Sequence, residues 1–135
     1  MPHTSEKFFK ISNSIEFGKQ AQAEAVKFLK ADGYRIIRQN YRIKLGEIDI
    51  IAQNKEFTCF VEVKARSSVK YGLPCEAVCY SKQRQISKVA LSYLKENHLF
   101  DKCSRFDVVS LLRKEGYWEI NLIKNAFELD ARFTI

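Results

Sequence analysis

The sequence predicts one α+β domain in which a mixed five-stranded sheet is flanked by helices, in the order α-β-β-β-α-β-β. Two long segments carry apolar residues at helical spacing, and five shorter segments are rich in β-branched and aromatic residues. The length of 135 residues fits one core, and a hydrophobic fraction of 46% beside 29% charged residues is typical of a globular chain. We expect residues 1–13 to form a flexible tail and residues 14–135 to form the domain.

Each expected element depends on a local pattern. The elements are helices at 14–32 and 75–98 and strands at 34–43, 46–52, 57–65, 105–112 and 117–123. Ser14 suits the N-cap of the first helix, and Gly33 suits its end. Apolar positions recur about every 3.6 residues from Val78 to Leu94, which indicates the second helix. The polar loop at 53–56 joins two strand-like segments and predicts a β-hairpin.

The chain is basic, with 23 Lys and Arg against 16 Asp and Glu and a net charge of +7. Such a surface attracts polyanions, so nucleic acid is the first expected partner; a basic surface without a partner is the alternative. No apolar run is long enough for a membrane helix, and the N-terminal segment lacks the apolar block of a secretory signal. We therefore expect a cytoplasmic protein that does not contact membranes.

Three acids and a lysine are expected on one face of the hairpin, because side chains alternate between the faces of a strand. The residues of this face are Glu47, Asp49 and Ile51 on the first strand and Phe60, Glu62 and Lys64 on the second. Ile48 and Ile50 are then expected together on the opposite face. If the hairpin closes over residues 54–55, Glu47 lies opposite Glu62 and Asp49 lies opposite Phe60.

Acids gathered on neighbouring strands repel one another, so the pattern indicates a cation that offsets their charge. Oxygen ligands with some retained water are what Mg²⁺ prefers, and we expect weak binding of Mg²⁺ or Mn²⁺. Lys64 beside such a site could orient a water or neutralise charge that develops on a phosphate. The alternative is that the acids face solvent on an exposed sheet and that Lys64 pairs with one of them.

Long blocks of the sequence resemble the YraN-like family, small bacterial proteins whose fold is similar to restriction endonucleases and archaeal Holliday-junction resolvases. GEIDIIA followed by FVEVKAR is the specific part of the resemblance. Further blocks are AVKFL, DGYRIIRQNYR, YGLPCEAV, SKQRQISKVALSYL, RFDVV and NAF. The resemblance implies a restriction-endonuclease-like core with Asp49, Glu62 and Lys64 at the positions of an Asp and Glu-x-Lys catalytic set. Asp49 and Glu62 would bind the metal, with the backbone carbonyl of Val63 and Glu47 as further ligands.

One position departs from the family pattern. Relatives commonly carry a glutamate four residues after the glycine of the first helix, and Gly18 places that position at Gln22. Gln22 shares an apolar stripe with Ala25 and Leu29, so we expect it to face inward and support the site. A neutral amide adds no negative charge, so metal affinity should be lower than with a fourth acid, and catalysis could be lost.

Basic residues near the acids in sequence are candidates for nucleic-acid binding. They are Arg66, Lys70, Lys82 and Arg84. Lys82 falls on the inward stripe of the second helix, where its ammonium could reach a phosphate; extension into solvent is the alternative. The other three could form a phosphate track or be scattered surface charges. Asp107 is expected to pair with Arg105 or cap a loop rather than to bind metal.

Three functions follow from these patterns. The first is a metal-dependent endonuclease that acts on DNA, including branched DNA. The second is a DNA-binding module on a nuclease fold that has lost most or all catalysis, as Gln22 favours. The third is a protein-interaction adaptor with an incidentally basic surface. Symmetric cutting of a junction would require a homodimer, but the apolar pattern marks no interface.

Overall fold

The computed structural model describes residues 2–67 and 78–128, with side chains from residue 14 onward. The elements are α1 (Pro2–Ala31), β1 (Arg35–Ile43), β2 (Gly46–Asn54), β3 (Phe57–Arg66), α2 (Tyr80–Glu96), β4 (Ser104–Lys114) and β5 (Tyr117–Phe127). This order is the one that the sequence predicts. Neither helix in the described part of the chain has the length and apolar character needed to cross a membrane.

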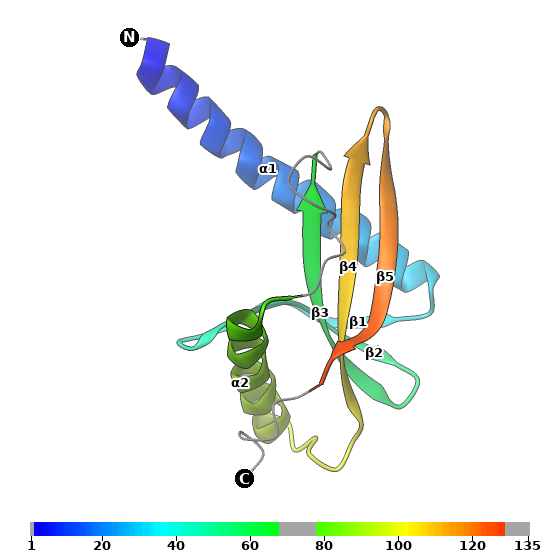
Figure 1. Ribbon diagram of the computed structural model, residues 1–135. Helices are drawn as coiled ribbons and strands as arrows, with labels where there is room; N and C mark the ends of the chain where they lie inside the picture. The colour runs from blue at the N-terminus through cyan, green and yellow to red at the C-terminus, as the bar shows by residue number, and fades with distance from the viewer. Residues whose placement is uncertain (1, 68–77, 129–135) are drawn as a thin grey trace.

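The five strands form one mixed sheet in the order β1-β2-β3-β4-β5. All neighbours are antiparallel except β3 and β4, which are parallel because α2 carries the chain back between them. Figure 1 shows the two helices on opposite faces of this sheet. The α2-side core contains Tyr41, Ile48, Ile51, Phe60, Ile86, Val89, Tyr93 and Phe106, and the α1-side core contains Ala21, Ala25, Leu29, Ile50, Val61, Val109 and Leu111. The expected sheet with flanking helices is confirmed.

Both helices begin at residues other than those expected. Helix α1 starts at Pro2, so Ser14 lies inside it and is not its N-cap. Helix α2 starts at Tyr80, after an extended Cys79 with φ −65° and ψ 157°. The carbonyl of Val78 accepts a hydrogen bond from Gln83 Nε2 at 2.7 Å, which holds this residue outside the helix. The expected start at 75–77 lies outside the described residues, and the division into a tail at 1–13 and a domain at 14–135 stays a prediction.

Asp107 is buried on β4 and pairs with Arg105, as expected. Arg105 Nε donates to Asp107 Oδ1 at 2.9 Å, and the Tyr34 hydroxyl donates to Oδ2 at 2.8 Å. The backbone N–H of Asn125 also donates to Oδ1, at the irregularity in the β4–β5 pairing. A buried carboxylate with these partners is satisfied. The cluster ties β4 to β5 and to Tyr34, which lies between α1 and β1, so its role here is structural.

Candidate metal centre

The β2–β3 hairpin brings Asp49 and Glu62 close together, just beyond its last paired residues. The hairpin closes over residues 55–56 rather than 54–55, and its pairing runs to Ile50 opposite Val61. The next residues along the two strands are Asp49 and Glu62. The predicted pairs of Glu47 with Glu62 and Asp49 with Phe60 are therefore wrong by two residues. A shift of two keeps every side chain of β3 on its predicted face.

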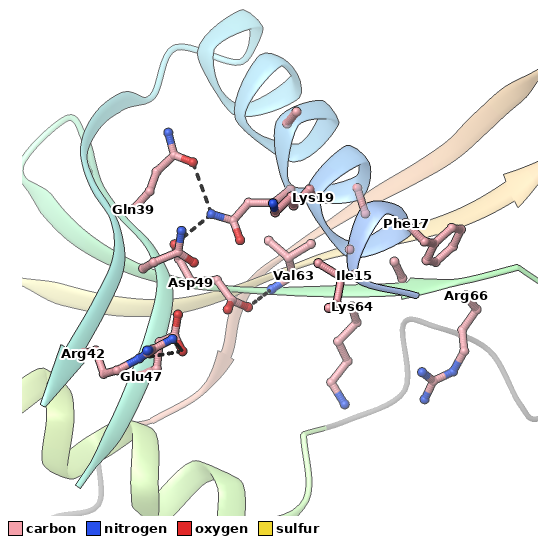
Figure 2. Close-up of a pocket in the computed structure, with 16 residues that line it drawn as sticks. Ile15, Phe17, Lys19, Gln39, Arg42, Glu47, Asp49, Val63, Lys64 and Arg66 are labelled. Carbon is pink, nitrogen blue, oxygen red and sulfur yellow. Dashed lines mark hydrogen bonds and ion pairs between the residues drawn. The ribbon is translucent and has the colours of Figure 1, made fainter. Parts of the chain in front are cut away.

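Asp49 lies where the alternation of β2 reverses. Ile48 packs in the α2-side core and Ile50 in the α1-side core, so the prediction that they share a face is wrong. Asn40, across from Asp49 on β1, has a positive φ of 55°, a conformation that Asn tolerates better than most residues. The Asp49 carboxylate turns toward β3, where its Oδ2 accepts the backbone N–H of Val63 at 2.9 Å (Figure 2). A side chain thus replaces a backbone partner where the β2–β3 pairing ends.

Glu62 is buried without full compensation. Its side chain is 8% exposed, and among the described residues its Oε1 has no hydrogen-bond partner. Burial, and next the charge of Asp49, raise the pKa of Glu62 from 4.5 to about 8. Burial is also the main cause that raises the pKa of Asp49. Two neighbouring carboxylates that resist ionisation form a site where a cation can take the place of a proton.

The donor set suits a hydrated hard cation rather than a metal held wholly by protein. Asp49 and Glu62 provide carboxylate oxygens, and Glu62 Oε1 is not otherwise engaged in the described part of the chain. Glu47 instead accepts hydrogen bonds from Arg42 Nη2 at 2.9 Å and Nε at 3.3 Å. No group of three or more His, Cys, Asp or Glu side chains with metal-binding geometry occurs among the described residues. Two carboxylates with water in the other positions are compatible with Mg²⁺.

A cleft of about 840 Å³ lies between α1 and strands β1 to β3, with Asp49 in its wall. Its basic side chains are Lys19, Arg42, Lys64 and Arg66. Lys64 and Arg66 extend from β3 on the side away from α1 (Figure 2). Lys19 and Arg42 were not predicted, although arginines recur along β1 in the sequence. Glu62 does not line the cleft, which therefore places one member of the acid pair, Asp49, among four basic side chains. Such a combination suits a phosphate-bearing ligand.

Gln22 lies in this cleft, on the inward side of α1 as expected. Its Nε2 donates to Gln39 Oε1 at 3.1 Å and approaches the backbone carbonyl of Asp49 at 3.5 Å. The amide therefore contacts the backbone of an acid rather than its carboxylate. Its supporting role stays a prediction.

The remaining predicted nucleic-acid-binding residues are dispersed. Lys82 of α2 approaches Glu62, with 3.9 Å between Nζ and Oε2. The guanidinium of Arg84 lies over the Tyr80 ring at 5.9 Å, and Arg84 does not line the cleft. Lys70 lies outside the described residues. Of the four predicted positions, the structure places Arg66 at the cleft and Lys82 beside the acid pair.

Comparison with known proteins decides the family. The model of the uncharacterised protein family UPF0102 matches residues 21–111. The chain belongs to the UPF0102 family. A UPF0102 protein of Syntrophus aciditrophicus is 47% identical over 121 residues, which cover 90% of this chain and 95% of the relative. A UPF0102 protein of Acetivibrio thermocellus is 48% identical over 122 residues, covering 86% and 94%.

UPF0102 is the YraN family, so the resemblance found in the sequence is confirmed. The matched region begins in α1 and ends in β4. It therefore includes Gln22, the acid pair and Lys82. The candidate centre therefore lies within the region of this UPF0102 protein that the family model matches.

Proposed function

We propose that this UPF0102 protein is a metal-dependent nuclease that binds DNA, including branched DNA, and hydrolyses its phosphodiester bonds in the cytoplasm. The observation that carries the proposal is the buried Glu62 carboxylate, which lies near Asp49 and has an Oε1 without a hydrogen-bond partner among the described residues. A fold gains nothing from such a pair without a cation, because desolvation and mutual repulsion both destabilise it. The net charge of +7 supports a polyanionic ligand.

Each residue of the centre has a role in this proposal. Asp49 and Glu62 would hold Mg²⁺ or Mn²⁺, and the Val63 carbonyl would be a further ligand. The bound cation supplies Lewis-acid stabilisation of charge on the phosphate. Lys64 extends from β3 at the cleft, where its ammonium orients the attacking water or neutralises developing negative charge. Arg66, in the same wall, binds a neighbouring phosphate.

The test is a nicking assay with linear, flapped and four-way DNA in MnCl₂ or MgCl₂. Wild-type protein is compared with Lys64→Ala and with Lys95→Ala, an exposed lysine at the far end of α2. We expect Lys64→Ala to lose cleavage and Lys95→Ala to keep it. Equal residual cleavage by all three proteins would reveal a contaminating nuclease and refute the catalytic assignment. Calorimetry should show that Asp49→Asn abolishes Mn²⁺ binding; unchanged binding would remove Asp49 from the ligand set.

A second candidate function is a DNA-binding module without catalysis. Gln22 favours it, because its amide supplies no negative charge beside Asp49. In this case the protein binds DNA with a steep salt dependence but cleaves none of the substrates in either metal. If the protein fails to bind DNA even at low salt, both functions are refuted and the protein-interaction adaptor is favoured. A stable dimer that cuts a four-way junction symmetrically would support resolvase-like action.

A further inference from the structure

Lys82 occupies an unusual position beside the acid pair. Its Nζ is 3.9 Å from Glu62 Oε2, which is at the outer limit of an ion pair. The Glu62 side chain is 8% exposed and the Lys82 side chain is 42% exposed, so the lysine reaches from solvent to a buried carboxylate. The positive charge of Lys82 also opposes the rise that burial causes in the pKa of both Asp49 and Glu62. A single ammonium therefore acts on both members of the pair from the α2 side.

We propose that Lys82 is the counter-cation of the Asp49–Glu62 pair when no metal is bound, and that a bound divalent cation displaces its ammonium onto a phosphate of DNA. This inference depends on the proposed function. An ammonium and a divalent cation at the same carboxylate repel each other, so metal binding weakens the ion pair between Lys82 and Glu62. Because the lysine stem is long and half in solvent, the freed ammonium can turn toward an anion outside the sheet.

Displacement of Lys82 couples two binding events. Without metal, the Lys82 ammonium stays beside Glu62 and contributes little to DNA binding. With metal, it becomes one more phosphate contact, close to Lys64 on the same face of the sheet. Metal then strengthens DNA binding, and by thermodynamic reciprocity DNA strengthens metal binding by the same factor. The lysine positions substrate only when the metal centre is filled.

The salt dependence of DNA binding tests this directly. Anisotropy of a fluorescent flapped DNA is measured at pH 8.5 over a range of KCl concentrations, with and without MnCl₂. A denaturing gel checks that the DNA stays intact. The proteins are wild type, Lys82→Met, Lys82→Arg and Lys95→Met, the last as a matched charge loss on α2. The slope of log binding constant against log KCl concentration should be equal for wild type and Lys82→Met without metal. With metal, the wild-type slope should be steeper than the Lys82→Met slope by about 0.9, the value for one phosphate contact.

Mn²⁺ affinity gives an independent measurement. Titrations by electron paramagnetic resonance at pH 8.5, without DNA, should show several-fold tighter binding to Lys82→Met, because the competing ammonium is gone. Lys82→Arg and Lys95→Met should behave like wild type. Circular dichroism and the melting temperature confirm that each variant is folded.

The outcomes separate this inference from the function on which it depends. If wild type binds both Mn²⁺ and DNA but the slopes of wild type and Lys82→Met differ equally with and without metal, Lys82 is a permanent phosphate contact and the exchange is refuted. Weaker Mn²⁺ binding by Lys82→Met would also overturn it, because the lysine would then support the metal. If wild type binds neither Mn²⁺ nor DNA, the proposed function fails, and the exchange fails with it.

Discussion

Replacing Glu62 by glutamine should stabilise the metal-free protein, and the gain should depend on pH. The unfolded chain loses the Glu62 proton near pH 4.5 and the folded chain near pH 8. Between these values the folded state holds more protons, so the free energy of unfolding falls as pH rises, and the decline is complete above the folded pKa. Each pH unit corresponds to about 1.36 kcal/mol, so the penalty reaches about 3 kcal/mol at pH 7 and about 5 kcal/mol above pH 8.

The Glu62→Gln substitution keeps the shape of the side chain and removes the titrating group. Urea unfolding from pH 5 to pH 9, with chelator present, should give wild-type and Glu62→Gln curves that nearly coincide at pH 5 and separate as pH rises. The matched control is Glu115→Gln, which removes an exposed carboxylate in the β4–β5 turn. The control should follow wild type at every pH.

Two results would refute this reasoning. A constant difference between Glu62→Gln and wild type across the pH range would mean that packing, not ionisation, separates them. A less stable Glu62→Gln at pH 8 would mean that the ionised carboxylate is favourable without metal. Either result would remove the electrostatic argument for a cation at this pair.

Substitutions at three further positions test other parts of the structure. Gln22→Glu should lower metal-free stability by about 1 kcal/mol, because a carboxylate replaces a donor near the Asp49 carbonyl, and should tighten Mn²⁺ binding; calorimetry and melting that both stay unchanged would place Gln22 away from the site. Asp107→Asn should cost about 3–5 kcal/mol in urea unfolding, because it strands the buried charge of Arg105; a loss below about 1 kcal/mol would contradict the pairing. Asn40→Val should cost about 1–2 kcal/mol and Asn40→Gly much less, because the positive φ suits glycine; equal melting temperatures would contradict that backbone conformation.

The sequence predicts elements better than it predicts register. Apolar periodicity locates both helices and all five strands, because burial of one face is encoded residue by residue. The hairpin loop at 53–56 allows closure over either of two adjacent residue pairs, and only the folded turn, with Lys55 at a φ of 55°, selects one. That choice moves Asp49 from a predicted position opposite Phe60 to one beside Glu62. The sequence therefore predicts which acids lie on the hairpin but not which residues they face across it.

Other features depend on contacts between distant elements. The reversal of alternation at Asp49 accompanies the positive φ of Asn40, and a count of alternate residues along β2 cannot detect it. The approach of Lys82 to Glu62 depends on how α2 packs against the sheet. The apolar pattern correctly predicts that Lys82 lies on the inward stripe of the helix. It predicts a phosphate as the partner of the ammonium and gives no sign of its approach to Glu62.

The reversal at Asp49 also explains how a carboxylate is held where folding disfavours it. Ile48 and Ile50 are both fully buried, one in each core. Complete burial of two isoleucines contributes about 3–6 kcal/mol, which is comparable with the several kcal/mol lost when a carboxylate is desolvated. Because the two side chains are anchored on opposite faces, the residue between them cannot rotate into solvent without exposing one of them. The apolar neighbours of Asp49, rather than the acids themselves, therefore fix the geometry of the centre. The Ile-Asp-Ile segment at 48–50 is needed for the fold as well as for the chemistry of the carboxylate.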